Sequence, residues 1–176
     1  VVHCGQMGRA FIFRNGETRD TSLDGFTIQN GKVNDENGGA VVVENAAPTI
    51  RNCIFRNNSA FKQTGSIASS GGAVYLEGAN LLIEGCVFEN NSADVTGAVH
   101  ADQSDFIMRN CRFINNNGVG HAGAMFCSAC SPKLEKCVFV GNKTGGWGGA
   151  VWGWNAEITF ISCAFYGNQA YVGGAI

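Results

Sequence analysis

A repeat of about 25 residues constrains the fold of this chain more than any other feature of its sequence. A Gly-Ala pair recurs, with its alanine at Ala40, Ala73, Ala98, Ala124, Ala150 and Ala175. Each of the first five alanines is followed, at fixed distances, by a cysteine, a phenylalanine and an asparagine, for example Cys86, Phe88 and Asn91. Only the stretch between the asparagine and the next Gly-Ala pair varies in length. Such a pattern is typical of a stacked array.

Within each repeat, apolar residues alternate with a period of two, which predicts β-strands. Val74 and Leu76 form one alternating pair, and Cys86 and Phe88 form another. The alternation slips once before each cysteine, at Asn52, Gly85, Asn110, Lys136 and Ser162. A one-residue bend needs left-handed backbone, which Asn and Gly tolerate and which Lys and Ser fit less well. The pattern therefore predicts three short strands, one tight bend and one variable loop in each repeat.

These elements predict an all-β parallel β-helix, or solenoid, of about six to seven coils of roughly 25 residues, with three short strands per coil. Coils stacked about 4.8 Å apart pair their backbones and place identical side chains in columns. We expect a single domain over 1–176, with degenerate first coils at 1–37, where Phe26 replaces the cysteine, and regular repeats at 38–176. Because the chain stops within a new Gly-Gly-Ala word, we also expect a fragment of a longer array.

The words Gly-Gly-Ala-Val and Phe-x-x-Asn resemble the repeat of the polymorphic outer membrane proteins, an adhesin and autotransporter family. The opening segment 22–31, Ser-Leu-Asp-Gly-Phe-Thr-Ile-Gln-Asn-Gly, is similar to the first coils of secreted right-handed β-helix proteins of the pectate-lyase-like superfamily. The resemblance covers nearly the whole chain and implies a right-handed coil and an extracellular or cell-surface location. It implies less about activity, because that fold carries lyases, hydrolases, adhesins and structural fibres.

Charge and hydropathy exclude some classes of function. The formal net charge is −2 and no basic stripe is present, which disfavours nucleic-acid binding. No apolar window of about 18 residues occurs, so we expect no transmembrane segment in this stretch. The loop at 60–70 is the longest, and we interpret it as a tolerated insertion. Its polar residues, including Ser66, indicate no particular chemistry.

Five of the eight cysteines occupy the repeated column, where we expect buried, reduced thiols. Stacked residues have parallel Cα–Cβ vectors, which are poorly placed for a disulfide. Cys127 and Cys130 form a separate Cys-x-x-Cys pair. Simple packing is the favoured interpretation for that pair, while a local disulfide and half of a zinc site stay open. The sequons at Asn57, Asn90 and Asn142 are candidate glycosylation sites if the source glycosylates.

Two outward rows of the first strand are the candidate binding surface. One row is predicted to contain Val42, Tyr75, His100, Phe126 and Trp152, and the next Glu44, Glu77, Asp102, Ser128 and Trp154, with Trp147 in the adjoining loop. Outward aromatics are unexpected on a solvated sheet face. They indicate either a platform for sugar rings, with carboxylates that bind hydroxyls or Ca²⁺ or act as acid and base, or a surface that packs on another chain.

The case for catalysis is weaker, and no catalytic residue is assigned. Glu77 and Asp102 are expected about 5 Å apart along the stack, a spacing compatible with a retaining glycosidase, although stacked surface acids also occur without catalysis. We interpret His100 as a histidine stacked on the surface between aromatic neighbours. The sequence identifies no partner for His3 or His121.

The favoured function is an extracellular or cell-surface structural or adhesive module. Its aromatic and acidic face would be presented to a partner protein, a second copy of the chain or a glycan. The alternative is a fragment of a β-helix enzyme that binds or degrades polysaccharide. No cofactor or metal site is expected, except that a polysaccharide lyase would imply Ca²⁺.

Overall fold

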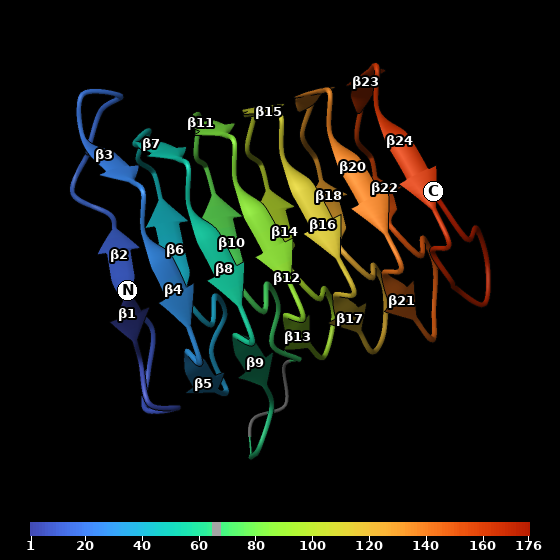
Figure 1. Ribbon diagram of the computed structural model, residues 1–176, viewed down its shortest axis with the longest axis horizontal. Helices are drawn as coiled ribbons and strands as arrows, with labels where there is room; N and C mark the ends of the chain where they lie inside the picture. The colour runs from blue at the N-terminus through green and yellow to red at the C-terminus, as the bar shows by residue number, and fades with distance from the viewer. Residues whose placement is uncertain (65–67) are drawn as a thin grey trace.

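The computed structural model describes residues 1–64 and 68–176, and these residues form strands but no helix. The strands pair in parallel and build four sheets that run along the long axis of the molecule (Figure 1). Successive coils stack side by side, from the N-terminal coil at one end to the C-terminal coil at the other. The predicted parallel β-helix is therefore confirmed. Residues 65–67, in the predicted long loop and including Ser66, lie outside the described residues.

We name the four sheets A to D. Sheet C, the first strand of each repeat, contains β2 (Phe11–Phe13), β6 (Val41–Glu44), β10 (Val74–Glu77), β14 (Val99–Asp102), β18 (Met125–Ser128) and β22 (Val151–Trp154). Sheet D contains β3 (Ser22–Asp24), β7 (Thr49–Arg51), β11 (Leu82–Glu84), β15 (Ile107–Arg109), β19 (Lys133–Glu135) and β23 (Thr159–Ile161). Sheet A contains β1 (Val2–His3), β4 (Thr27–Gln29), β8 (Ile54–Arg56), β12 (Val87–Glu89), β16 (Arg112–Ile114), β20 (Val138–Val140) and β24 (Ala164–Tyr166).

Sheet B is a fourth sheet that the predicted three strands per coil did not include. It contains β5 (Lys32–Asn34), β9 (Ser59–Phe61), β13 (Ser92–Ala93), β17 (Asn117–Gly118) and β21 (Lys143–Thr144). These strands are two or three residues long and begin the stretch that the sequence marks as a loop of variable length. A segment this short shows no alternation, so periodicity cannot reveal it.

The predicted one-residue bends between sheets D and A have left-handed backbone. Their φ angles are 52° at Asn52, 62° at Gly85, 53° at Asn110, 53° at Lys136 and 52° at Ser162. Lys136 and Ser162 therefore adopt the same conformation as the asparagines and the glycine. The geometry of the stack imposes this bend even where the side chain does not favour it.

The interior contains the predicted columns. Phe55, Phe88, Phe113 and Phe139 are fully buried, and each neighbouring pair of rings is nearly parallel with centroids 4.7–4.9 Å apart. A glycine is required where the coils approach most closely, because a Cβ on Gly72 would collide with the carbonyl oxygen of Gly97.

A ladder of buried asparagines runs beside the phenylalanine column. The Asn116 side-chain amide donates hydrogen bonds to the Phe88 carbonyl oxygen and to Asn142 Oδ1, both at 2.9 Å. Its own oxygen accepts hydrogen bonds from the backbone N–H and the side-chain amide of Asn91, both at 3.0 Å. The ladder thereby satisfies polar groups that would otherwise be buried without partners.

The first coil departs from the repeat in one respect. Leu23 and Ile28 pair with Ile50 and Phe55, as the sequence predicts. Phe26, which aligns with the cysteine column, is nevertheless 39% exposed and packs edge-on against Phe11. It precedes β4 at the end of the stack, where β3 is the terminal strand of sheet D.

Candidate functional site

The outer face of sheet C carries the predicted aromatic row. Tyr75 on β10 pairs with His100 on β14, His100 with Phe126 on β18, and Phe126 with Trp152 on β22. The Tyr75 and His100 rings stack with centroids 5.2 Å apart, and those of Phe126 and Trp152 stack at 4.7 Å. Parallel pairing brings side chains from four successive coils into one row.

Two members of the row are less exposed than outward residues of a solvated sheet should be. Val42 is 2% exposed and Phe126 is 8% exposed. Phe126 is covered by rings on several sides, with His100 at 4.8 Å, Trp152 at 4.7 Å and His121 at 6.0 Å between centroids. The prediction that these residues face outward is correct, but they form a packed layer rather than a row of free rings.

His121 belongs to this layer, although the sequence identified no partner for it. Its ring stacks on Trp152 at 4.5 Å and on Trp147 at 5.3 Å between centroids. His121 and Trp147 each lie three residues before the alanine of their repeat, at Ala124 and Ala150. That shared repeat position was the signal that could have placed His121 beside Trp147. His3 also has a partner, since its Nε2 lies 2.8 Å from the Asn30 side-chain nitrogen.

The two exposed rings of this face lie in the C-terminal coils. Trp147 is 44% exposed, and its ring centroid lies 5.4 Å from that of Trp152. Trp154, on the neighbouring outward position of β22, is 64% exposed and lies 6.0 Å from Trp152. We define the aromatic cluster as Tyr75, His100, His121, Phe126, Trp147, Trp152 and Trp154. Large exposed rings held by stacking provide contact area with few rotamers to immobilise on binding.

Carboxylates continue the row that contains Trp154, and we call Glu44, Glu77 and Asp102 the acidic row. Glu77 pairs in register with Glu44 on one side and with Asp102 on the other. The Tyr75 hydroxyl lies 3.4 Å from the Glu77 carboxylate. Burial, followed by the charge of Glu77, raises the pKa of Tyr75 to about 12. Tyr75 therefore remains a neutral hydrogen-bond donor at physiological pH.

The two histidines of the aromatic cluster are held in the neutral form by their surroundings. Burial lowers the pKa of His100 to about 4, and the Asp102 carboxylate opposes this shift only in part. Burial also lowers the pKa of His121. His121 Nδ1 is buried without a hydrogen-bond partner among the described residues. Neutral rings stack on their aromatic neighbours without the cost of burying a charge.

A depression of about 190 Å³ lies at the N-terminal end of the acidic row. Glu44, Tyr75 and Glu77 line it together with Arg9, which forms an ion pair with Glu36. Arg9 was not a candidate from the sequence, because it precedes the first regular repeat and no periodic pattern positions it. It places a cation next to the acidic row, where the sequence had indicated only carboxylates.

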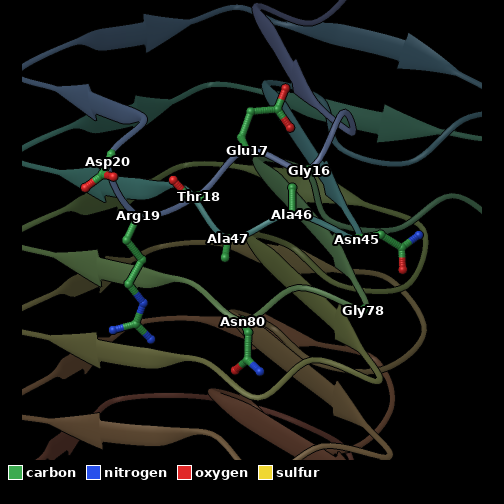
Figure 2. A pocket seen from close by; sticks show the side chains of 10 residues that line it. All are labelled: Gly16, Glu17, Thr18, Arg19, Asp20, Asn45, Ala46, Ala47, Gly78 and Asn80. Atoms are coloured by element: carbon green, nitrogen blue, oxygen red, sulfur yellow. The ribbon is translucent and has the colours of Figure 1, made fainter.

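A second depression, of about 580 Å³, lies at the corner where sheet C turns into sheet D. Glu17, Arg19 and Asp20 line it from the connection between β2 and β3, and Asn45 and Asn80 lie in later coils. Figure 2 shows that the charged side chains diverge from this loop instead of pointing together into the depression. A ligand site needs convergent polar groups, so this depression is not the candidate site.

The structure contradicts one of the predicted glycosylation sites. Asn57 and Asn90 are exposed at the corner before sheet B, in positions that a glycan can reach. Asn142 is fully buried, and its amide nitrogen donates to the Phe113 carbonyl oxygen and to Asn168 Oδ1. Its sequon is one position out of phase with the other two, so Asn142 belongs to the buried asparagine ladder and is not a glycan acceptor in the folded chain.

The cysteines are free thiols throughout the structure, including Cys127 and Cys130. In the column, Cys111 Sγ contacts the carbonyl oxygens of Arg109 at 3.2 Å and Ile83 at 3.8 Å. The other column cysteines contact carbonyl oxygens in the same way. Within residues 1–64 and 68–176, no group of three or more His, Cys, Asp or Glu side chains is arranged to hold a metal ion.

Comparison with known protein families identifies one family that matches the chain. The family described as the right-handed β-helix region matches residues 6–165, which covers most of the chain. Neither the search of curated proteins nor the search of solved structures found a match. The described residues form no helix, and therefore none that could span a membrane. With the parallel coils described above, the matched span shows that this chain belongs to the right-handed β-helix family.

Proposed function

We propose that this protein is a structural or adhesive module that binds a partner through the aromatic cluster and the acidic row. The observation that carries the proposal is the partly exposed layer of Trp147, Trp152 and Trp154 on the outer face of sheet C, in which Trp147 stacks on Trp152 and Trp154 packs against it at a tilt. Tryptophan is enriched among the residues that dominate binding energies. Exposed apolar side chains gathered on one face of a soluble domain mark interaction sites.

The stacked coils support this role because their continuous core holds the outer face of sheet C rigidly. Parallel strands pair across every coil from β2 to β22, so the outer face of sheet C is backed by a continuous buried core. A rigid support reduces the entropy lost when the rings bind. The resemblance of the repeat to secreted and outer-membrane families supports an extracellular or cell-surface location for the module.

The partner is a glycan, a second copy of the chain or another protein. A glycan array and sedimentation velocity, both applied to the intact protein, separate the first two possibilities. We expect glycan binding or self-association to be lost in Trp152→Ala and retained in Tyr166→Ala. Tyr166 is 77% exposed on sheet A and lies outside the aromatic cluster. Equal loss in both variants would refute the assignment of the binding surface.

A polysaccharide-cleaving function is the second candidate, and it rests on Glu77 and Asp102. These carboxylates occupy the same position on adjacent coils, beside the Tyr75 ring. Paired carboxylates are the groups that glycoside hydrolysis requires. The test incubates a panel of polysaccharides with the protein, with and without Ca²⁺, and assays reducing ends and unsaturated products. Activity that disappears in Glu77→Gln or Asp102→Asn would establish the enzyme; no product from any polysaccharide would exclude this candidate for that panel.

A further inference from the structure

Cys127 and Cys130 differ from the column cysteines in where they lie. Cys127 occupies the inward position of β18 that is Ala101 in the coil before and Gly153 in the coil after. Cys130 follows a tight turn in which Ala129 has left-handed backbone, with a φ of 49°. The turn directs Cys130 back into the core, where it is 4% exposed, while Cys127 is fully buried.

The turn also places both thiols in the core of a single coil. Cys130 lies three residues after Cys127, on the other side of the left-handed residue Ala129. In the column, by contrast, neighbouring thiols belong to different coils and are stacked in register, with parallel Cα–Cβ vectors that suit a disulfide poorly. Two cysteines that meet across a turn of one coil do not have this constraint. The Cys-x-x-Cys pair is therefore better arranged for a disulfide than the column is.

An open cavity beside Cys130 gives small molecules access to the pair. It has a volume of about 530 Å³ and is lined by Cys130 together with Ala129, Gly153 and Ala156. Gly153 and Ala156 come from the next coil, and Asp105 and Glu157 add two carboxylates to the wall. Cys130 therefore lies at the wall of the cavity, whereas no column cysteine is part of that wall.

We propose that Cys127 and Cys130 form a thiol–disulfide exchange site that accepts small disulfides through this cavity. Cys130 is the attacking residue, because it lines the cavity, and Cys127 is the resolving residue behind it. Hydrogen bonding to Cys127, followed by the backbone of Ser104, lowers the pKa of Cys130 against the effects of burial and of the charges of Asp105 and Asp102. The same hydrogen bonding, together with burial, raises the pKa of Cys127. The pKa values of Cys86 and Cys137 in the column are lowered too, but neither of these thiols lines the cavity. A lower thiol pKa increases the thiolate fraction that attacks.

The exchange balances without any other reactant. The Cys130 thiolate attacks one sulfur of the small disulfide, whose S–S bond breaks, and the departing thiolate takes up the proton that Cys130 lost. Cys127 then gives up its proton and attacks the Cys130 sulfur of the mixed disulfide, and the second small thiolate leaves with that proton. One small disulfide is reduced to two thiols, while the two cysteines are oxidised to one protein disulfide.

The test uses the chromogenic disulfide 5,5′-dithiobis(2-nitrobenzoate) on the folded protein. Cys4→Ser and Cys163→Ser are included as a background, since these two thiols are partly exposed near the ends of the stack. We expect two nitrobenzoate thiolates released per chain and no retained adduct. Cys127→Ser should release one and keep the adduct, whereas Cys130→Ser should release none before unfolding. Cys111→Ser, a matched change in the column, should behave like the background.

Any of three results would overturn the proposal. They are no release from the folded background protein, an unchanged release in Cys130→Ser, or an adduct that maps to the column. Because serine substitutions in a core can prevent folding, a second measurement uses the unsubstituted chain. Peptide mapping after treatment with oxidised glutathione should find a crosslink between Cys127 and Cys130. Its absence, or a crosslink between column cysteines instead, contradicts the proposal directly.

Discussion

At the first inward position of sheet C the residue hardly changes from β6 to β22, whereas at the neighbouring outward position it changes at every coil. The inner positions that begin β6, β10, β14, β18 and β22 are Val41, Val74, Val99, Met125 and Val151, and all of them are fully buried. The paired outer positions are Ile12, Val42, Tyr75, His100, Phe126 and Trp152. Both faces belong to the same strands and share the same register.

The difference shows which residues the fold specifies and which it leaves free. At the first inward position a smaller side chain leaves a cavity and a larger one causes strain, so successive coils keep nearly the same volume there. Outside, any residue compatible with a strand is accepted. The increase in ring size towards Trp152 is therefore not required by the coil, and it is the part of sheet C on which a binding function can act.

The largest effect should come from breaking the interior. Phe113→Ala removes a ring stacked between Phe88 and Phe139, with centroids 4.7 Å away on both sides. We expect the free energy of unfolding to fall by about 3–5 kcal/mol. Arg112→Ala, the exposed neighbour on β16, should change it by less than about 0.5 kcal/mol. Urea denaturation measures both changes. Similar losses in the two variants would contradict the assignment of Phe113 to the core and of Arg112 to the surface.

The asparagine ladder should give the next largest effect. Asn116→Ala leaves the Phe88 carbonyl oxygen and the backbone N–H of Asn91 without these side-chain partners in the interior. We expect a loss of about 2–3 kcal/mol in the free energy of unfolding. Asn115→Gly is the control, since Asn115 is exposed with a φ of 52°, which glycine adopts readily. Thermal unfolding would contradict the ladder if Asn116→Ala were as stable as this control.

The packed layer on the outer face should make stability depend on pH. The folded pKa of His100, about 4, lies below its ordinary value of 6.5. The unfolded chain therefore binds the proton more readily than the folded chain. The stability that the neutral His100 ring contributes is fully present above pH 6.5 and is lost as the pH falls towards 4. We expect His100→Phe to reduce the loss of stability between pH 7 and pH 5 by about 1–2 kcal/mol. Urea midpoints at pH 7 and pH 5 measure this loss of stability, with His3→Gln as the control. An identical pH dependence in the unsubstituted chain, His100→Phe and His3→Gln would rule out a neutral His100 in the folded chain.

The smallest effect on stability should come from the most exposed ring. Trp154 is 64% exposed and packs only through its 6.0 Å contact with Trp152 among the ring contacts of the described residues. We expect Trp154→Ala to change the free energy of unfolding by less than about 0.5 kcal/mol. A loss as large as that of Phe113→Ala would mean that the aromatic cluster is part of the core, and the contrast between the two faces would fail.

The sequence predicts the architecture well because the spacing from alanine to asparagine is constant. That constant spacing correctly predicts the register of Tyr75, His100, Phe126 and Trp152, and the left-handed bend at Lys136. The predictions weaken where the repeat changes length. Sheet B lies there, as does His121, whose stacking depends on how a loop closes rather than on strand alternation.

Burial and contacts from outside the repeat are also hard to predict. The Asn142 sequon matches the pattern at Asn57 and Asn90, yet a shift of one position moves its amide from the surface into the ladder. Arg9 reaches the acidic row from before the first regular coil. The constant spacing already assigns Asn142 to the asparagine column, and the sequon alone obscures this, whereas a contact made by a non-repeating segment is not visible in a periodic pattern.

The most direct test measures folding and binding on the same protein, the double variant Trp152→Ala, Trp154→Ala. Intact chain and variant are compared by sedimentation velocity and on a glycan array, after urea denaturation has shown both to be folded under the assay conditions. If the partner is a glycan or a second copy of the chain, the intact chain should show that association and the folded variant should not. A folded variant that binds as strongly as the intact chain would contradict the proposed binding surface.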